Sequence, residues 1–369
     1  MSGEVKAKPT YRTHSLQVLR QIFKGEAVVQ TPWPRMILCA VATLLPLAIG
    51  FMEGEIGIAI FGGLSGYMLA LNDHLGTLLH RAWVTSLSFF ILCVGFALGA
   101  HFRHDPLAYI LMLGGVSYWL GLLGGEGAEL ERAVLFSLIG YITAYTTPLI
   151  NPEVLPALFR YSLMSYACLV IGGPIVYLIT RHKAAEFARV RHSLKVSLTL
   201  KYERHVYAAC FTASVLAAVW FASEFKVEHG SWVAITVLIV LRPDRLLTVY
   251  KTLQRFFGTL VGVLCADVIV VLRPEAIVII LLLTICAFII PWAILKNYWL
   301  TSFLVTVFVV LLLELASGGG RNLRNGNLRL EATFLGCCLS LIGVGLSRFA
   351  DRVASWAGFD KSDGAPQSK

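Results

Sequence analysis

The sequence predicts an all-α integral membrane protein with about 12 transmembrane helices. Hydrophobic residues make up 57% of the 369 residues, charged residues make up only 14%, and the mean hydropathy is +0.73. Soluble domains carry about 25% charged residues. Runs of about 17–25 apolar residues, the length that crosses the hydrocarbon core of a bilayer, recur along the chain.

The apolar runs form two sets of six, in residues 36–180 and 205–347, joined by a basic linker at 181–204. Their periodicity and length predict helices at residues 36–51, 55–71, 83–101, 107–124, 133–150, 158–180, 205–223, 231–242, 256–272, 275–294, 297–315 and 330–347. Ahead of them, residues 1–35 include "SLQVLRQIFKG", which predicts a short amphipathic helix lying on the membrane surface.

Lysine and arginine residues predict the orientation in the membrane. Residues 1–35 carry six of them and the linker 181–204 carries seven, and such an excess marks the cytoplasmic side. We therefore expect a multi-pass inner (plasma) membrane protein with both termini, including the tail 348–369, in the cytoplasm. The loop 318–331 disagrees, because strict alternation puts its three arginines outside. Either a helix is miscounted, or these arginines have a role other than topology.

The two sets read as parallel six-helix repeats of one unit. The segment "LALNDHLGTLLHRAWVTSLSF" at 69–89 parallels "IVLRPDRLLTVYKTLQRFFGTLV" at 239–261, and the starts of the two sixth helices also correspond. The paired residues are Asp73 with Asp244, Arg81 with Arg255, and Arg160 with Arg329. Because each unit has an even number of crossings, both enter from the same side, which predicts a pseudo-dimer with a central pathway between its halves.

The stretch "LRPDR" at 241–245 interrupts an apolar region and predicts a broken helix. Pro243 removes one backbone N–H donor and disfavours helix at Arg242. Asp244 is placed to cap a second helix that begins there. Broken helix in a membrane is tolerated where protein covers it or where it lines a water-filled cavity, and a half-helix N-terminus points donors at anions.

Arginines at equivalent places in the two repeats are the main candidate site residues. An arginine in a membrane helix normally faces a cavity, pairs with another group or extends to the interface. Arg81 and Arg255, with Arg160 and Arg329, would form two tiers of positive charge along one pathway, which selects anions. Arg245 and Lys251 are better explained as ordinary loop charges.

Three further residues of the second repeat invite interpretation. Gly258 and Gly262 in "GTLVG" predict close helix packing. Asp267 lies within an apolar run and is either a protonatable group or an aspartate paired with arginine or backbone.

Several other classes of function find no support in the sequence. The net charge of +9 falls in cytoplasmic segments, so we do not expect nucleic-acid binding. The eight cysteines lie inside apolar runs without metal-ligand spacing, and we expect neither metal nor cofactor. Catalytic motifs such as HExxH or a phosphate-binding glycine loop do not occur, so we expect no enzyme. His74 and His80 form a weak pair that we expect to be solvated.

The region 231–266, "SWVAITVLIVLRPDRLLTVYKTLQRFFGTLVGVLCA", resembles the fusaric acid resistance-like family, which includes the bacterial aromatic acid exporters. The family pattern is a Trp-containing helix with Thr, a Pro-containing break, then Arg, Gly-Thr and a later Gly. The matching residues are Trp232, Thr236, Pro243, Arg255, Gly258, Thr259 and Gly262, followed by Lys296, Asn297 and Tyr298, and then by Arg329 and Gly336. The resemblance covers residues 205–347.

This resemblance implies a proton-driven inner-membrane exporter of aromatic or other organic acids. We expect the substrate to contact Arg255, Arg329, Arg81, Arg160, Arg242, Trp232 and Thr259, with Asp267, Asp244 or Asp73 as the coupling carboxylate. A passive anion channel, similar to the plant malate channels that also resemble this membrane part, is the first alternative. The second is a non-catalytic membrane assembly subunit. Further partners would be a periplasmic adaptor or other copies of the chain.

Overall fold

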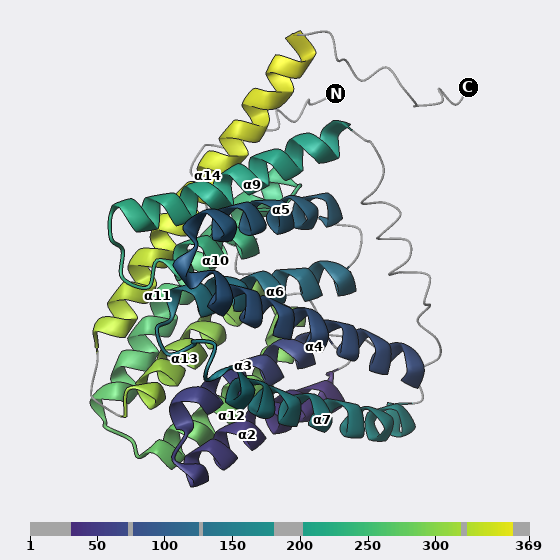
Figure 1. Ribbon diagram of the computed structural model, residues 1–369, viewed down its shortest axis with the longest axis vertical. Helices are drawn as coiled ribbons and strands as arrows, with labels where there is room; N and C mark the ends of the chain where they lie inside the picture. The colour runs from purple at the N-terminus through teal and green to yellow at the C-terminus, as the bar shows by residue number, and fades with distance from the viewer. Residues whose placement is uncertain (1–30, 73–76, 125–127, 181–201, 319–322, 357–369) are drawn as a thin grey trace, which may run out of the picture.

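The computed structural model describes residues 31–72, 77–124, 128–180, 202–318 and 323–356, and the regular structure of these residues is helical (Figure 1). The first half comprises α2 (Trp33–Glu53), α3 (Ile56–Leu71), α4 (Leu78–His101), η1 (Phe102–His104), α5 (Pro106–Leu123), α6 (Ala128–Thr146) and α7 (Leu155–Thr180). The second half comprises α9 (Tyr202–Glu224), α10 (Ser231–Val240), α11 (Arg245–Val271), α12 (Ala276–Lys296), α13 (Tyr298–Ala316) and α14 (Arg324–Trp356).

The prediction of an all-helical membrane protein is confirmed. Among the described residues, nine helices are long and apolar enough to cross a membrane, and α3 and α10 are shorter apolar helices. Helix α6 belongs to neither group, because its first turn carries Glu129, Glu131 and Arg132. Most of its residues from 129 to 144 are buried among other helices, so this helix is covered by protein over most of its surface.

The helix boundaries that differ most from the sequence prediction are the start of α11 and the end of α14. Helix α11 begins at Arg245 instead of 256, and Asp244 caps it as expected, its carboxylate accepting from the N–H groups of Leu246 and Leu247. Helix α14 continues to Trp356, well past the expected end at 347. The predicted amphipathic helix near the N-terminus, Asp73, His74 and most of the basic linker lie outside the described residues.

Corresponding helices of the two halves have corresponding packing partners. Helix α4 packs against α6 as α11 packs against α13, and α3 packs against α7 as α10 packs against α14. Between the halves, α2 packs on α12 and α5 packs on α9. The short helices α3 and α10 lie deep in the bundle, where every residue of α10 except Ile239 is buried. This arrangement puts α3, α10 and the helices that pack on them at the centre.

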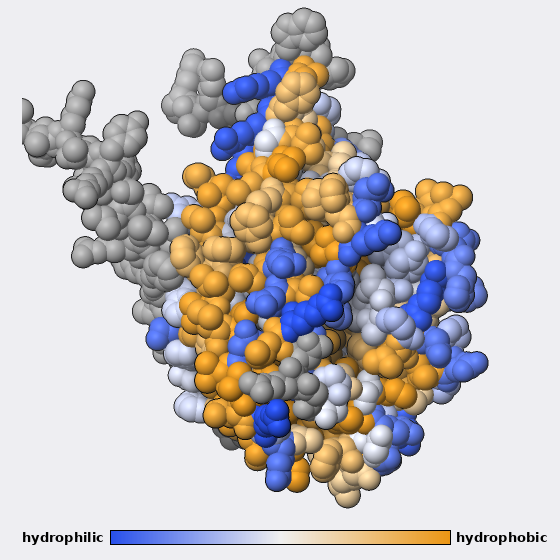
Figure 2. Space-filling model, turned by 90° about the vertical axis from the view of Figure 1, so that its left-hand side faces the viewer, coloured by the Kyte–Doolittle hydropathy of each residue, from blue (hydrophilic) through white to orange (hydrophobic). Residues whose placement is uncertain are grey.

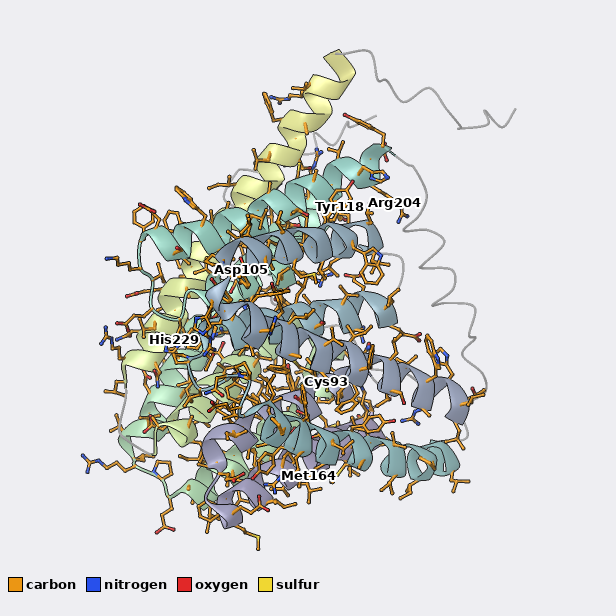
Figure 3. All side chains as sticks on the ribbon, viewed as in Figure 1. Cys93, Asp105, Tyr118, Met164, Arg204 and His229 are labelled. Carbon is orange, nitrogen blue, oxygen red and sulfur yellow. The ribbon has the colours of Figure 1, made fainter. Side chains whose placement is uncertain are left out.

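The connections that follow α2, α4, α9 and α11 lie at one end of the bundle (Figure 1). Asp105 and His229 mark this end, and Arg204 lies toward the opposite end (Figure 3). Figure 2 looks onto the end with His229, where polar residues gather among apolar ones. The helix flanks expose large apolar side chains, among them Phe90, Leu178, Leu264, Phe334 and Ile342. Such flanks suit contact with lipid.

Glycines hold α11 against α13 at very short range, as the "GTLVG" sequence predicts. A Cβ atom at Gly258 would lie 2.4 Å from the carbonyl oxygen of Trp299, and one at Gly262 would lie 2.8 Å from that of Phe303. Gly95 and Gly99 of α4 face the backbone of α6 in the same way. The backbones therefore approach too closely to accept a methyl group.

We predict that Gly258→Ala destabilises the protein, because the new methyl group must push α11 away from α13. Overpacking of this kind costs about 1–3 kcal/mol. Thermal unfolding of the purified protein in detergent should show a lower melting temperature. Gly345→Ala is the matched control, since its Cβ would meet nothing within 4 Å. Equal melting temperatures for the two variants would contradict this packing.

Candidate functional site

Two arginines predicted from the sequence meet in the centre of the second half. Arg255 lies on α11, about 15 Å along the helix axis from Arg245, and Arg329 lies in the second turn of α14. Their exposed fractions are only 2% and 3%. Helices α11 and α14 pack together, and the two side chains are close enough for their positive charges to interact. The fold therefore buries two like charges side by side.

Neither guanidinium has an acidic partner among the described residues. Nε and Nη2 of Arg255 and Nε of Arg329 are buried and make no hydrogen bond. A buried donor left without a partner costs about 1–3 kcal/mol, and more when the group is charged. An anion placed between the two arginines would satisfy these donors and offset the repulsion. The arrangement is therefore suited to binding an anion.

Aromatic side chains form the walls around the two arginines. The Cζ atom of Arg329 lies 4.9 Å from the centre of the Trp232 ring, a cation–π contact. Tyr298, at the start of α13, has a buried hydroxyl that lies close to Arg255. Tyr67 contributes a third ring from α3 of the first half, also within reach of Arg255. Both halves of the chain thus line the site.

Short polar side chains fix the position of Arg255 between α11 and α13. Ser302 of α13 donates a hydrogen bond to the carbonyl oxygen of Arg255 at 3.1 Å. One turn further along, Thr306 donates to Thr259 at 3.4 Å, and both hydroxyls are fully buried. Thr259 therefore links α11 to α13 one turn away from Arg255.

The predicted break between α10 and α11 is present, but its charges are already satisfied. Arg242 forms an ion pair with Glu131 of α6, and its backbone N–H donates to the Thr248 hydroxyl at 2.9 Å. Asp244 is exposed and accepts from the first free N–H groups of α11. The expectation that this half-helix terminus points donors at a substrate anion is wrong, because Asp244 supplies the anion there.

The first-half arginines do not join the buried pair. Arg160 is 47% exposed and pairs with Glu53 and Glu55 near the α2–α3 turn. Arg81 is buried on α4, and one of its nitrogens lies 3.5 Å from the carbonyl oxygen of Gly173 on α7. Two symmetric tiers of free positive charge are therefore not found, because glutamates neutralise Arg160.

Two of the three arginines in 318–331, Arg324 and Arg329, belong to the described residues, and both have a structural role besides any effect on membrane orientation. Arg324 forms an ion pair with Glu228 of the α9–α10 connection, and Arg329 lies in the site. Asp267 of α11 is half-buried and faces Gly326, and its Oδ1 atom has no hydrogen-bond partner. In the part of the chain that the structure describes, no arginine or lysine forms an ion pair with Asp267.

One expectation about histidine is wrong. His80 is fully buried, and its Nε2 atom lies 3.1 Å from a carboxylate oxygen of Glu129. The sequence around residue 129 reads as a polar loop, so only the folded chain reveals this pair.

Comparison with known proteins finds a family model that matches part of the chain. Residues 214–343 match the family model described as fusaric acid resistance protein-like. The predicted resemblance is confirmed over these residues, which include Trp232, Arg255 and Arg329. No curated protein and no solved structure matches the chain. Together with the long apolar helices of the described residues, this match identifies a multi-pass membrane protein.

We predict that an aromatic anion stabilises the protein through these arginines. Phthalate should raise the melting temperature, whereas its uncharged diamide should not; a ligand at 100 times its Kd adds about 2.7 kcal/mol. Arg329→Gln should abolish the response, because the variant lacks one of the two cations. Arg324→Gln, on the same helix but outside the site, should respond like the wild type. The same phthalate effect in both variants would contradict the site.

Proposed function

We propose that this protein exports organic anions, preferably aromatic carboxylates, across the inner membrane, and that Arg255 and Arg329 bind the carboxylate. The observation that carries this proposal is the burial of two neighbouring guanidinium groups without an acidic partner among the described residues. Two buried cations are unfavourable unless an opposite charge joins them. A carboxylate supplies this charge and two acceptor oxygens that match the donor geometry of arginine.

The aromatic walls support a preference for a ring next to the carboxylate. The Trp232 ring contacts Arg329, so an anion bound to Arg329 lies beside a flat apolar surface. The Tyr298 hydroxyl is buried and free to donate a hydrogen bond to the substrate. Aromatic rings that stack in offset or edge-to-face contact contribute about 0.5–1.5 kcal/mol beyond their buried area. An aromatic carboxylate would use both features of the site.

The proposed export mechanism uses both halves of the chain as a pseudo-dimer of two parallel six-helix repeats. The matching packing partners of α2–α7 and α9–α14 support this arrangement. The proposed site lies beside α13, on which α3 of the first half packs, and relative movement of the two repeats at this contact would open it to either side. With both termini in the cytoplasm, the end marked by His229 faces outward.

Burial of the arginines favours a carrier over a passive channel. In an open pore both guanidinium groups would be wet, whereas their exposed fractions are 2% and 3%. A closed site of this kind binds one substrate per cycle. A proton gradient would drive the cycle, because inward proton movement can be exchanged for an outgoing anion.

We predict that Arg255→Ala lowers export by about tenfold or more, since a charge-assisted hydrogen bond contributes about 1.5–3 kcal/mol. The measurement is efflux of labelled phthalate, whose two charges keep it from leaking through lipid, from proteoliposomes with an imposed pH gradient. Arg324→Ala serves as the control and should transport like the wild type. Equal efflux by Arg255→Ala would overturn the proposed role of Arg255. If bilayer recordings show that many ions pass in each opening, the protein is a channel and not a carrier.

A further inference from the structure

A second buried polar cluster lies where the C-terminus of α3 meets the N-terminal turns of α4 and α6. His80 of α4 is fully buried, and Glu129 of α6 is 5% exposed. The His80 Nε2 atom lies 3.1 Å from Oε1 of Glu129. Asn72, the C-cap of α3, donates to the Ser88 hydroxyl at 2.7 Å and to the Glu129 carbonyl oxygen at 3.0 Å. Three helices of the first half thus enclose an imidazole–carboxylate pair.

The second carboxylate oxygen of Glu129 accepts no hydrogen bond from the described residues. Its Oε2 atom is buried and has no hydrogen-bond partner among the described residues. A buried carboxylate oxygen without a donor is unfavourable, and a proton on the pair removes the net negative charge. When an imidazole–carboxylate pair binds one proton, its net charge rises by one unit. The pair therefore has room for one exchangeable proton.

Charged groups connect this pair to the anion site of the second half. Glu131, two residues after Glu129 on α6, forms the ion pair with Arg242 at the break between α10 and α11. Arg132 interacts electrostatically with Glu129, Glu131 and Arg242 together. Beyond the break, the Lys251 ammonium lies 5.5 Å from the Tyr298 ring, which borders Arg255.

The other ionisable groups around the pair are mostly cations. Among the described residues, Arg132 from α6 interacts with Glu129, Arg35 from α2 binds the carbonyl oxygens of Ala70 and Leu71 next to Asn72, and Arg81 follows His80 on α4. Arg242, Lys251, Glu131 and the phenol of Tyr207 form the next group of charges, at the α10–α11 break. Loss of the Glu129 charge leaves Glu131 as the acid shared by Arg132 and Arg242. Through Arg132, the charge of Glu129 is thus in electrostatic contact with the ion pair at the α10–α11 break.

We propose that the His80–Glu129 pair is the proton-binding site that couples anion export to the proton gradient, an inference that rests on the proposed export function. Proton and anion occupy the protein in alternation. In this scheme a proton crosses the bundle from the end marked by His229 and binds the pair after the carboxylate has left the arginines, and the charge of the pair changes from −1 to 0. Carboxylate binding from the cytoplasm returns the proton to cytoplasmic water, so one proton enters for each exchange.

The test measures protons released when phthalate binds to the full-length protein in detergent, by calorimetry in buffers of different ionisation enthalpy. The wild type should release close to one proton per phthalate, and its affinity should fall by up to about tenfold for each unit that the pH is lowered. Glu129→Gln and His80→Gln should bind phthalate but release none, with an affinity insensitive to pH. Glu153→Gln, an exposed carboxylate of the same half, should behave like the wild type.

Each contrary outcome has a distinct meaning. Unchanged proton release in His80→Gln and Glu129→Gln would overturn the inference, as would loss of release in Asp267→Asn alone. A wild type that binds phthalate without releasing protons would overturn the coupling site and leave the anion site standing. Failure of the wild type to bind phthalate would overturn both. The two variants lie on different helices, and size-exclusion profiles identify any that fails to fold.

Discussion

The structure depends on the burial of Arg255 near Arg329, with no carboxylate of the described residues to balance their charges. Charge this deep is maintained only if the helices around it are held firmly, because moving either helix outward would hydrate the guanidinium group. The glycine contacts between α11 and α13 and the Ser302 hydrogen bond to the Arg255 backbone supply this rigidity. The close packing of α11 on α13 is therefore needed to keep the guanidinium groups of the site buried.

The two halves have similar helix packing but different electrostatics. Arg160 is neutralised by Glu53 and Glu55, whereas its counterpart Arg329 stacks on Trp232 without an acidic partner in the described part of the chain. The first half instead buries the His80–Glu129 pair. We infer a division of labour in which one half binds the anion and the other holds the proton. The Glu131–Arg242 ion pair connects them.

Much of the fold could be predicted because hydrophobicity and backbone chemistry are local. Apolar runs located the helices, Pro243 located the break, and "GTLVG" located a close helix contact that the structure confirms. The apolar run alone placed the start of α11 at 256, because Arg245 and Lys251 resemble loop charges, whereas Pro243 and Asp244 predicted a helix that begins near 244, as the structure has it. In the fold, Lys251 lies over the Tyr298 ring and Arg245 contacts Ser347 of α14, so neither interrupts the helix.

The candidate site could be predicted only in part, because pairing between distant residues leaves no local signal. Arg255, Arg329 and Trp232 were found from repeat position and family pattern. The partners of Arg160 lie more than one hundred residues away in the chain, and so does Glu131, the partner of Arg242. Nothing near residue 129 indicates burial, since two glutamates and an arginine in one turn are typical of a solvated helix start.

A double-mutant cycle on phthalate affinity tests the central claim most directly. Arg255→Gln, Arg329→Gln and the double variant would be compared with the wild type by titration calorimetry. If both arginines bind one anion, each single change should remove most of the affinity, and the double change should remove much less than the sum of the two. Independent, additive losses, or an affinity untouched by either change, would contradict a shared anion between the two buried guanidinium groups.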